Sequence, residues 1–134
     1  MRSSILVAED NAFSRELLIQ QLKSLDREAV AVSDGSEAIS AWRSGDFDLL
    51  LTDHEMPGMS GCELAGLIRG GLWHADAPIV LLTAGTASID SMNAVALIDE
   101  VLIKPASMAT LREVLDKWLG PARPSGAGVE SCPS

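Results

Sequence analysis

The chain has 134 residues, of which 47% are hydrophobic and 4% aromatic, and its formal net charge is -9 at pH 7. This length suits one domain with a real core, and the acidic balance argues against nucleic-acid binding through a basic surface. No stretch approaches the roughly 18 apolar residues of a membrane span and no signal peptide is evident, so we expect a soluble, cytoplasmic protein without direct membrane contact.

Short apolar runs alternate with helical patterns along the whole chain. Five runs predict strands, at residues 5–8, 29–32, 49–52, 79–82 and 101–103. The segments between them predict helices that begin near Asn11, Asp34, Ser60, Ser88 and Ser107. The third helix opens with a capping box of Ser60 and Glu63, and Leu64, Leu67 and Ile68 are predicted to face inward. The three consecutive leucines at 49–51 are typical of a central parallel strand that is buried on both faces.

This alternation predicts an α/β fold with helices on both faces of a parallel sheet and right-handed crossovers. The common solution at this size is the flavodoxin-like (βα)5 doubly wound sheet with strand order 2-1-3-4-5. Periodicity alone leaves the order open, and it rests partly on the resemblance described below. From Gly120 onward Pro, Gly and Ser accumulate. We therefore predict one domain over residues 1–119 and a flexible tail or interdomain linker over 120–134.

Polar side chains follow four of the predicted strands at the point where each strand ends. They are Glu9 and Asp10, Asp53, Thr83, and Lys104. The carboxyl ends of parallel strands share one edge of a sheet, where open α/β sheets place their ligand sites. Three neighbouring carboxylates repel one another and need a cation, and oxygen ligands suit Mg²⁺. With an ammonium and a hydroxyl added, the set predicts a phosphoryl receptor in which Asp53 attacks phosphorus and forms an aspartyl-phosphate.

With these residues in this order, the chain resembles the receiver domain of two-component response regulators. The matching features are Glu9-Asp10, Asp53, Met56-Pro57-Gly58 with Gly61, Thr83-Ala84, and Lys104-Pro105. The resemblance covers residues 4–119. It implies that Asp53 accepts a phosphoryl group from a phosphohistidine. It further implies that Asp10, Asp53 and the main-chain carbonyl of Glu55 bind Mg²⁺, with Glu9 acting directly or through water.

The resemblance also assigns roles to the ends of the last two strands. Thr83 would swing toward the phosphoryl group, Lys104 would pair with its oxygens, and the peptide before Pro105 would be cis. The chain departs from the family pattern at Val101, where an aromatic switch residue is common. Leu97-Ile98 likewise replace a frequent Gly-Ala. These departures affect the readout of phosphorylation rather than its chemistry.

The resemblance implies a phosphoacceptor rather than an enzyme with turnover, and its partners are a histidine kinase core and/or a histidine phosphotransfer domain. The Glu-Asp-Asn start and the Asp-X-X-Met-Pro-Gly-Met-X-Gly run are similar to receivers of hybrid sensor histidine kinases. A stand-alone response regulator acting through protein contacts is the alternative. An aspartate-nucleophile phosphatase, a nucleotide-binding module and a pure interaction scaffold fit the residues less well. The oligomeric state is left open.

Several other residues have simpler interpretations. His54 is predicted to be a partly exposed loop residue beside the site, and His74 receives no function. Met56 is predicted to pack in the interior. Cys62 and Cys132 lack metal-like spacing, so we expect two free thiols in a reducing compartment.

Overall fold

The computed structural model describes residues 4–45, 47–71, 76–84 and 98–120. Along the chain its elements are β1 (Ser4–Ala8), α1 (Ala12–Ser24), β2 (Glu28–Val32), α2 (Gly35–Ser44), β3 (Leu49–Asp53), α3 (Gly61–Arg69), β4 (Ile79–Thr83), β5 (Glu100–Ile103) and α5 (Met108–Leu119). The strands form one parallel sheet in the order β2-β1-β3-β4-β5. The predicted fold class and strand order are confirmed. The helix expected at 88–96 and residues 121–134 of the expected tail lie outside the described residues.

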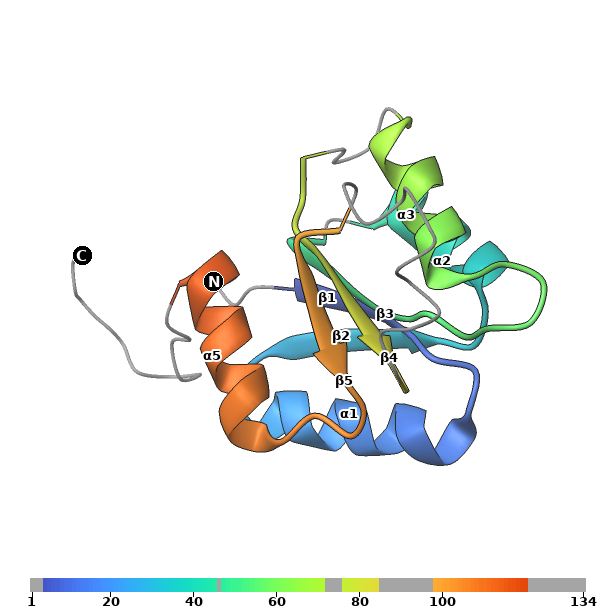
Figure 1. The fold of residues 1–134 in the computed structure, drawn as a ribbon. Helices are drawn as coiled ribbons and strands as arrows, with labels where there is room; N and C mark the ends of the chain where they lie inside the picture. The colour runs from blue at the N-terminus through green and yellow to red at the C-terminus, as the bar shows by residue number, and fades with distance from the viewer. Residues whose placement is uncertain (1–3, 46, 72–75, 85–97, 121–134) are drawn as a thin grey trace.

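Helices cover both faces of the sheet. Helices α1 and α5 lie on one face, and α2 and α3 lie on the other (Figure 1). The pleat sends alternate side chains of β3 into two cores, so Leu49 and Leu51 pack with residues of α1 and α5. Leu50 points the other way and packs with residues of α2 and α3. All five residues of β3 are buried, as the sequence predicts for a central strand, and this rigid strand carries Asp53 at its end.

Helix α3 begins directly beside the carboxyl edge of the sheet. The predicted capping box is present, with Glu63 N donating to Ser60 Oγ at 3.1 Å and Ser60 N donating to Glu63 Oε1 at 2.9 Å. Leu64 and Ile68 are buried as expected, but the prediction for Leu67 is wrong because its side chain is 52% exposed. The buried arc of α3 also includes Ala65, and Leu67 lies outside this arc.

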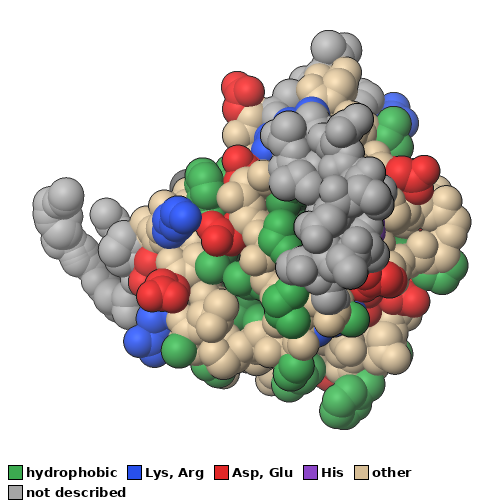
Figure 2. Space-filling view, in the orientation of Figure 1, with side chains coloured by type: hydrophobic (Ala, Val, Ile, Leu, Met, Phe, Trp, Pro, Cys, Tyr) green, Lys and Arg blue, Asp and Glu red, His purple; other side chains and the backbone are tan. Residues whose placement is uncertain are grey.

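None of the described helices is both long enough and apolar enough to cross a membrane. Acidic side chains occur at several places on the face drawn in Figure 2, in keeping with the net charge of -9. Of the two cysteines, Cys62 is a buried free thiol, and Cys132 lies outside the described residues.

Candidate functional site

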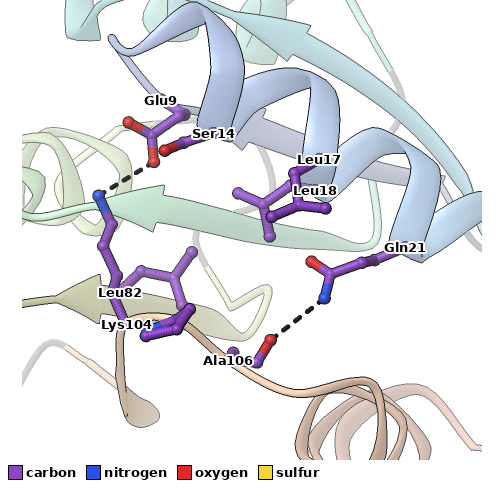
Figure 3. Close-up of a pocket in the computed structure, with 9 residues that line it drawn as sticks. Glu9, Ser14, Leu17, Leu18, Gln21, Leu82, Lys104 and Ala106 are labelled. Atoms are coloured by element: carbon purple, nitrogen blue, oxygen red, sulfur yellow. Dashed lines mark hydrogen bonds and ion pairs between the residues drawn. The ribbon is translucent and has the colours of Figure 1, made fainter.

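The predicted site residues converge at the carboxyl edge of the sheet. Asp53 and Thr83 are the last residues of β3 and β4, while Glu9 and Lys104 come directly after β1 and β5. Lys104 Nζ lies 2.9 Å from Asp53 Oδ1 and 3.1 Å from Glu9 Oε1. Figure 3 shows Lys104 and Glu9 reaching toward each other from strand ends that are far apart in the sequence. One ammonium therefore pairs with two carboxylates.

Three carboxylates form a compact group of oxygen ligands. One oxygen from each of Glu9, Asp10 and Asp53 lies within 4.8 Å of the others, with Glu9 and Asp53 buried and Asp10 exposed. Among the described residues, Asp53 Oδ1 and Glu9 Oε1 accept no well-aligned hydrogen bond, although both are within ion-pair distance of Lys104. A compact, partly buried set of carboxylate oxygens of this kind fits a hard divalent cation such as Mg²⁺.

The protonation of the site follows from burial and charge. Burial is the main cause that raises the pKa of Asp53 from 3.8 to about 7; the charge of Glu9 raises it further, and Lys104 opposes both. Burial lowers the pKa of Lys104, but the pairs with Asp53 and Glu9 outweigh it and raise that pKa overall. Lys104 is therefore a fixed positive charge at neutral pH. Asp53, with a pKa of about 7, is only partly ionised at that pH in the metal-free protein.

Thr83 has a partner that the sequence did not reveal. Its side chain is fully buried, and its hydroxyl donates to Glu55 Oε2 at 2.8 Å. The backbone is fixed separately, since Lys104 N donates to the carbonyl of Thr83 at 2.8 Å. The only sign of this contact in the sequence is that an acid, Glu55, follows Asp53 by two residues. Val101, at the position of the missing aromatic residue, is half-buried and packs against Cys62 and Leu81.

His54 is not the partly exposed loop residue that the sequence suggested, because its side chain is only 6% exposed. Its backbone continues the path of β3: His54 N donates to the carbonyl of Leu82 at 2.8 Å, and Gly61 N donates to the carbonyl of His54 at 2.9 Å. Both contacts place His54 between β4 and the start of α3. Met56 is buried as predicted, and His74 lies outside the described residues.

Gly61 allows α3 to start against the backbone at the end of β3. A Cβ atom at this position would lie 2.5 Å from the carbonyl oxygen of Asp53 and 2.5 Å from Leu81 Cδ1, closer than any side chain tolerates. The Cα of His54 would be 3.0 Å away. Because backbone atoms block two directions, a larger residue can be accommodated only if α3 moves away from β3. Gly61 thus fixes the backbone that follows Asp53.

The variant Gly61→Ala is expected to lose about 1–3 kcal/mol of unfolding free energy through overpacking. It should also weaken Mg²⁺ binding, because the segment from Asp53 to Glu55 shifts. The measurements are urea unfolding and isothermal titration with Mg²⁺. Gly70→Ala is the matched control, because among the described residues an added Cβ there meets only the carbonyl of Gly66 at 3.4 Å and the backbone is helical. Equal stability of the two variants would contradict the steric role of Gly61.

A small cavity of about 90 Å³ lies next to the acidic group, between α1 and the segment that joins β5 to α5. Glu9 and Lys104 lie at one end of this cavity, and Leu17, Leu18 and Leu82 line it in Figure 3. Across it, Gln21 Nε2 donates to the carbonyl of Ala106 at 3.2 Å and ties α1 to that segment.

The fold and the site together define a class: a doubly wound parallel sheet with acids, a buried threonine and a paired lysine at its carboxyl edge. The model of the response regulator receiver domain family matches residues 5–116. The chain belongs to this family, and it is a receiver domain of two-component signalling. The resemblance seen in the sequence is confirmed.

Three relatives illustrate the match. The sensor protein GacS of Pseudomonas syringae pv. syringae is 35% identical over an alignment of 122 residues, and the match covers 87% of this chain and 13% of GacS. The response regulator TrrA of Thermotoga maritima, solved with Mg²⁺-BeF, is 38% identical with a TM-score of 0.80 and covers 87% of this chain and 99% of its own.

The receiver domain of the sensor histidine kinase PA1611 of Pseudomonas aeruginosa PAO1, solved with magnesium in its active-site cleft, is 28% identical with a TM-score of 0.82. It covers 90% of this chain and 99% of its own. TrrA has also been solved in complex with the histidine kinase ThkA, and that copy has a TM-score of 0.77 and 38% identity over 87% of this chain and 98% of its own. The chain thus spans nearly all of the TrrA chain and about an eighth of GacS.

Proposed function

We propose that Asp53 accepts a phosphoryl group from a phosphohistidine. A carboxylate oxygen of Asp53 attacks phosphorus, the bond between phosphorus and the imidazole nitrogen breaks, and the imidazole leaves with the electron pair. The observation that carries this proposal is the position of Asp53 at a buried strand end, 2.9 Å from Lys104 and inside the three-acid group. Lys104 would pair with the phosphoryl oxygens, and the hydroxyl of Thr83 would donate to one of them.

We place the metal on Asp10, Asp53 and the main-chain carbonyl of Glu55, with Glu9 as a direct or water-mediated ligand. When bound, Mg²⁺ would offset the charge of the carboxylates and of the incoming phosphoryl oxygens. The compact all-oxygen set supports this assignment, as do the magnesium-containing structures of TrrA and PA1611. Asp10 is the exposed member and gives the ion its path from solvent.

We further propose that the domain, over residues 1–119, works in the cytoplasm as a module of a hybrid sensor histidine kinase. The small share of GacS that it spans and its likeness to the PA1611 receiver support this context. Its partners would be a histidine kinase core and/or a histidine phosphotransfer domain, as the TrrA–ThkA complex suggests, with no nucleic-acid or membrane contact. The similarity to the response regulator TrrA keeps a stand-alone response regulator as the alternative. Phosphoryl transfer would be self-catalysed, without substrate turnover.

The proposed function is tested by incubating the full chain with a small phosphodonor and Mg²⁺ and measuring the intact mass. The expected result is a single added phosphoryl group that hydroxylamine removes and that EDTA prevents from forming. Phosphotransfer from the labelled chain to a histidine phosphotransfer domain tests the relay context. A phosphoryl group that resists hydroxylamine, or one that appears equally in EDTA, would overturn the assignment.

The raised pKa of Asp53 predicts that Mg²⁺ binding depends on pH. The ion displaces the proton that Asp53 holds below its pKa of about 7. We therefore expect the apparent affinity for Mg²⁺ to be about ten-fold weaker at pH 6 than at pH 8. Titrations followed by tryptophan fluorescence or by amide chemical shifts would measure it. A pH-independent affinity over this range would show that the carboxylate is already ionised at pH 6.

A further inference from the structure

The carboxylate of Glu55 holds the hydroxyl of Thr83 in the unphosphorylated protein. Thr83 is fully buried at the end of β4, and its Oγ1 donates to Glu55 Oε2 at 2.8 Å. Glu55 itself is exposed. The bond joins two residues that are 28 positions apart in the sequence. It connects the loop after the phosphoacceptor to the neighbouring strand end.

A hydroxyl has one proton to donate. Thr83 therefore cannot donate to Glu55 and to a phosphoryl oxygen on Asp53 at the same time. The backbone cannot adjust much, because Thr83 is paired with Ile103 in the sheet and its carbonyl accepts from Lys104 N. The change must come from the side chain, and a β-branched side chain has few rotamers. Donation to Glu55 and donation to a phosphoryl group are thus two alternative states of Thr83.

We propose that the Glu55 carboxylate is a positioning residue that competes with the phosphoryl group for the hydroxyl of Thr83. This inference rests on the proposed function and adds a regulatory part to that site. Hydrogen bonds to a charged acceptor are stronger than those between neutral groups, so Glu55 stabilises the resting state. Because Glu55 is exposed, its carboxylate stays accessible to water when Thr83 leaves it, and the exchange buries no charge. Glu55 therefore sets the free-energy difference between the two states of Thr83.

The test uses beryllofluoride with Mg²⁺ as the probe of the phosphoryl-bound state. Half-saturating concentrations are measured by amide chemical shifts for the full chain, for Glu55→Ala, for Thr83→Val and for the double variant. Losing one charge-assisted hydrogen bond should make beryllofluoride binding about ten-fold tighter in Glu55→Ala. Glu55→Gln keeps a neutral acceptor and should fall between Glu55→Ala and the unaltered chain. In the Thr83→Val background the gain should disappear.

Two controls separate this mechanism from simpler ones. Glu113→Ala removes another exposed glutamate, on α5, and should leave beryllofluoride binding unchanged. The γ-methyl resonance of Thr83, recorded without beryllofluoride, should shift in Glu55→Ala, which reports the resting contact directly. Equal gains from Glu55→Ala with Thr83 and with Val at position 83 would overturn the inference, because they would show charge repulsion alone. Failure of the unaltered chain to bind beryllofluoride would instead overturn the proposed function, and this inference with it.

Discussion

Replacing Asp53 with asparagine is expected to abolish phosphoryl uptake and, in EDTA, to stabilise the fold at pH 8. The amide is not a nucleophile toward phosphorus, so no acyl phosphate can form. It also removes a buried negative charge that lies next to Glu9. Intact mass after incubation with a phosphodonor measures the first effect, and urea unfolding measures the second.

The stability effect has a definite dependence on pH. The pKa of Asp53 is about 7 in the folded protein and is raised from 3.8. The folded state therefore holds a proton that the unfolded chain has already released, and this carboxyl lowers the stability of the unaltered protein as the pH rises from about 4 to about 7. Asparagine at position 53 has no such loss. The advantage of Asp53→Asn over the unaltered chain should grow between pH 5 and pH 8.

Asp26→Asn is the matched control, since it removes the same charge at a position away from the site. Asp26 has a φ of 61°, a left-handed conformation that asparagine also adopts readily. This variant should take up the phosphoryl group normally. Labelling of Asp53→Asn to the same extent as Asp26→Asn would remove Asp53 from the role of phosphoacceptor.

The fold and the convergence of the site were predictable because both depend on local pattern and on sheet geometry. Three leucines followed by Asp53 predict a buried strand with an acid at its end. In a parallel sheet every strand ends at the same edge, so Thr83 and Lys104 could be placed near Asp53 without knowing a single side-chain contact. The strand order needed the family resemblance, because hydrophobic periodicity says nothing about which strands are neighbours.

The remaining features depend on packing between segments that are distant in the sequence. The spacing of leucines in α3 is compatible with a buried or an exposed Leu67. Leu64 and Ile68 pack with residues of α2 and β4, and this packing leaves Leu67 exposed. The burial of His54 and the steric need for Gly61 both follow from how closely α3 approaches the end of β3. The Thr83–Glu55 hydrogen bond depends on side-chain rotamers, which no pattern in the sequence specifies.

Replacing Lys104 with methionine is expected to slow phosphoryl uptake by about 100- to 1,000-fold, the usual effect of losing one donor to a developing oxyanion. Methionine fills a similar volume without the charge. The side chain of Lys104 is 29% exposed, whereas those of its partners Glu9 and Asp53 are 0% and 2% exposed. Without the ammonium of Lys104, the two buried carboxylates repel each other and lose the cation that pairs with both of them. In EDTA at pH 8 we expect a loss of about 3 kcal/mol in unfolding free energy.

Mg²⁺ should separate the two consequences of Lys104→Met. The ion no longer meets the repulsion of the ammonium, so it should bind this variant at least as tightly as the unaltered chain. Saturating Mg²⁺ at about 100 times its dissociation constant adds about 2.7 kcal/mol of stability and should restore most of the loss. Phosphoryl uptake should stay slow, because the ion cannot replace the donor that we propose Lys104 supplies to the phosphoryl oxygens. Urea unfolding with and without Mg²⁺, combined with labelling rates from intact mass, measures both effects.

Lys117→Met provides the control for charge and side-chain chemistry. Its side chain is 60% exposed and its ammonium lies 3.0 Å from Glu100 Oε1, so water screens the pair and its loss should cost less than about 1 kcal/mol. Its labelling rate should match that of the unaltered chain. A Lys104→Met variant that labels as fast as Lys117→Met would show that the ammonium only neutralises the resting carboxylates. The role of Lys104 would then be structural, and the phosphoryl oxygens would depend on Mg²⁺ and Thr83 alone.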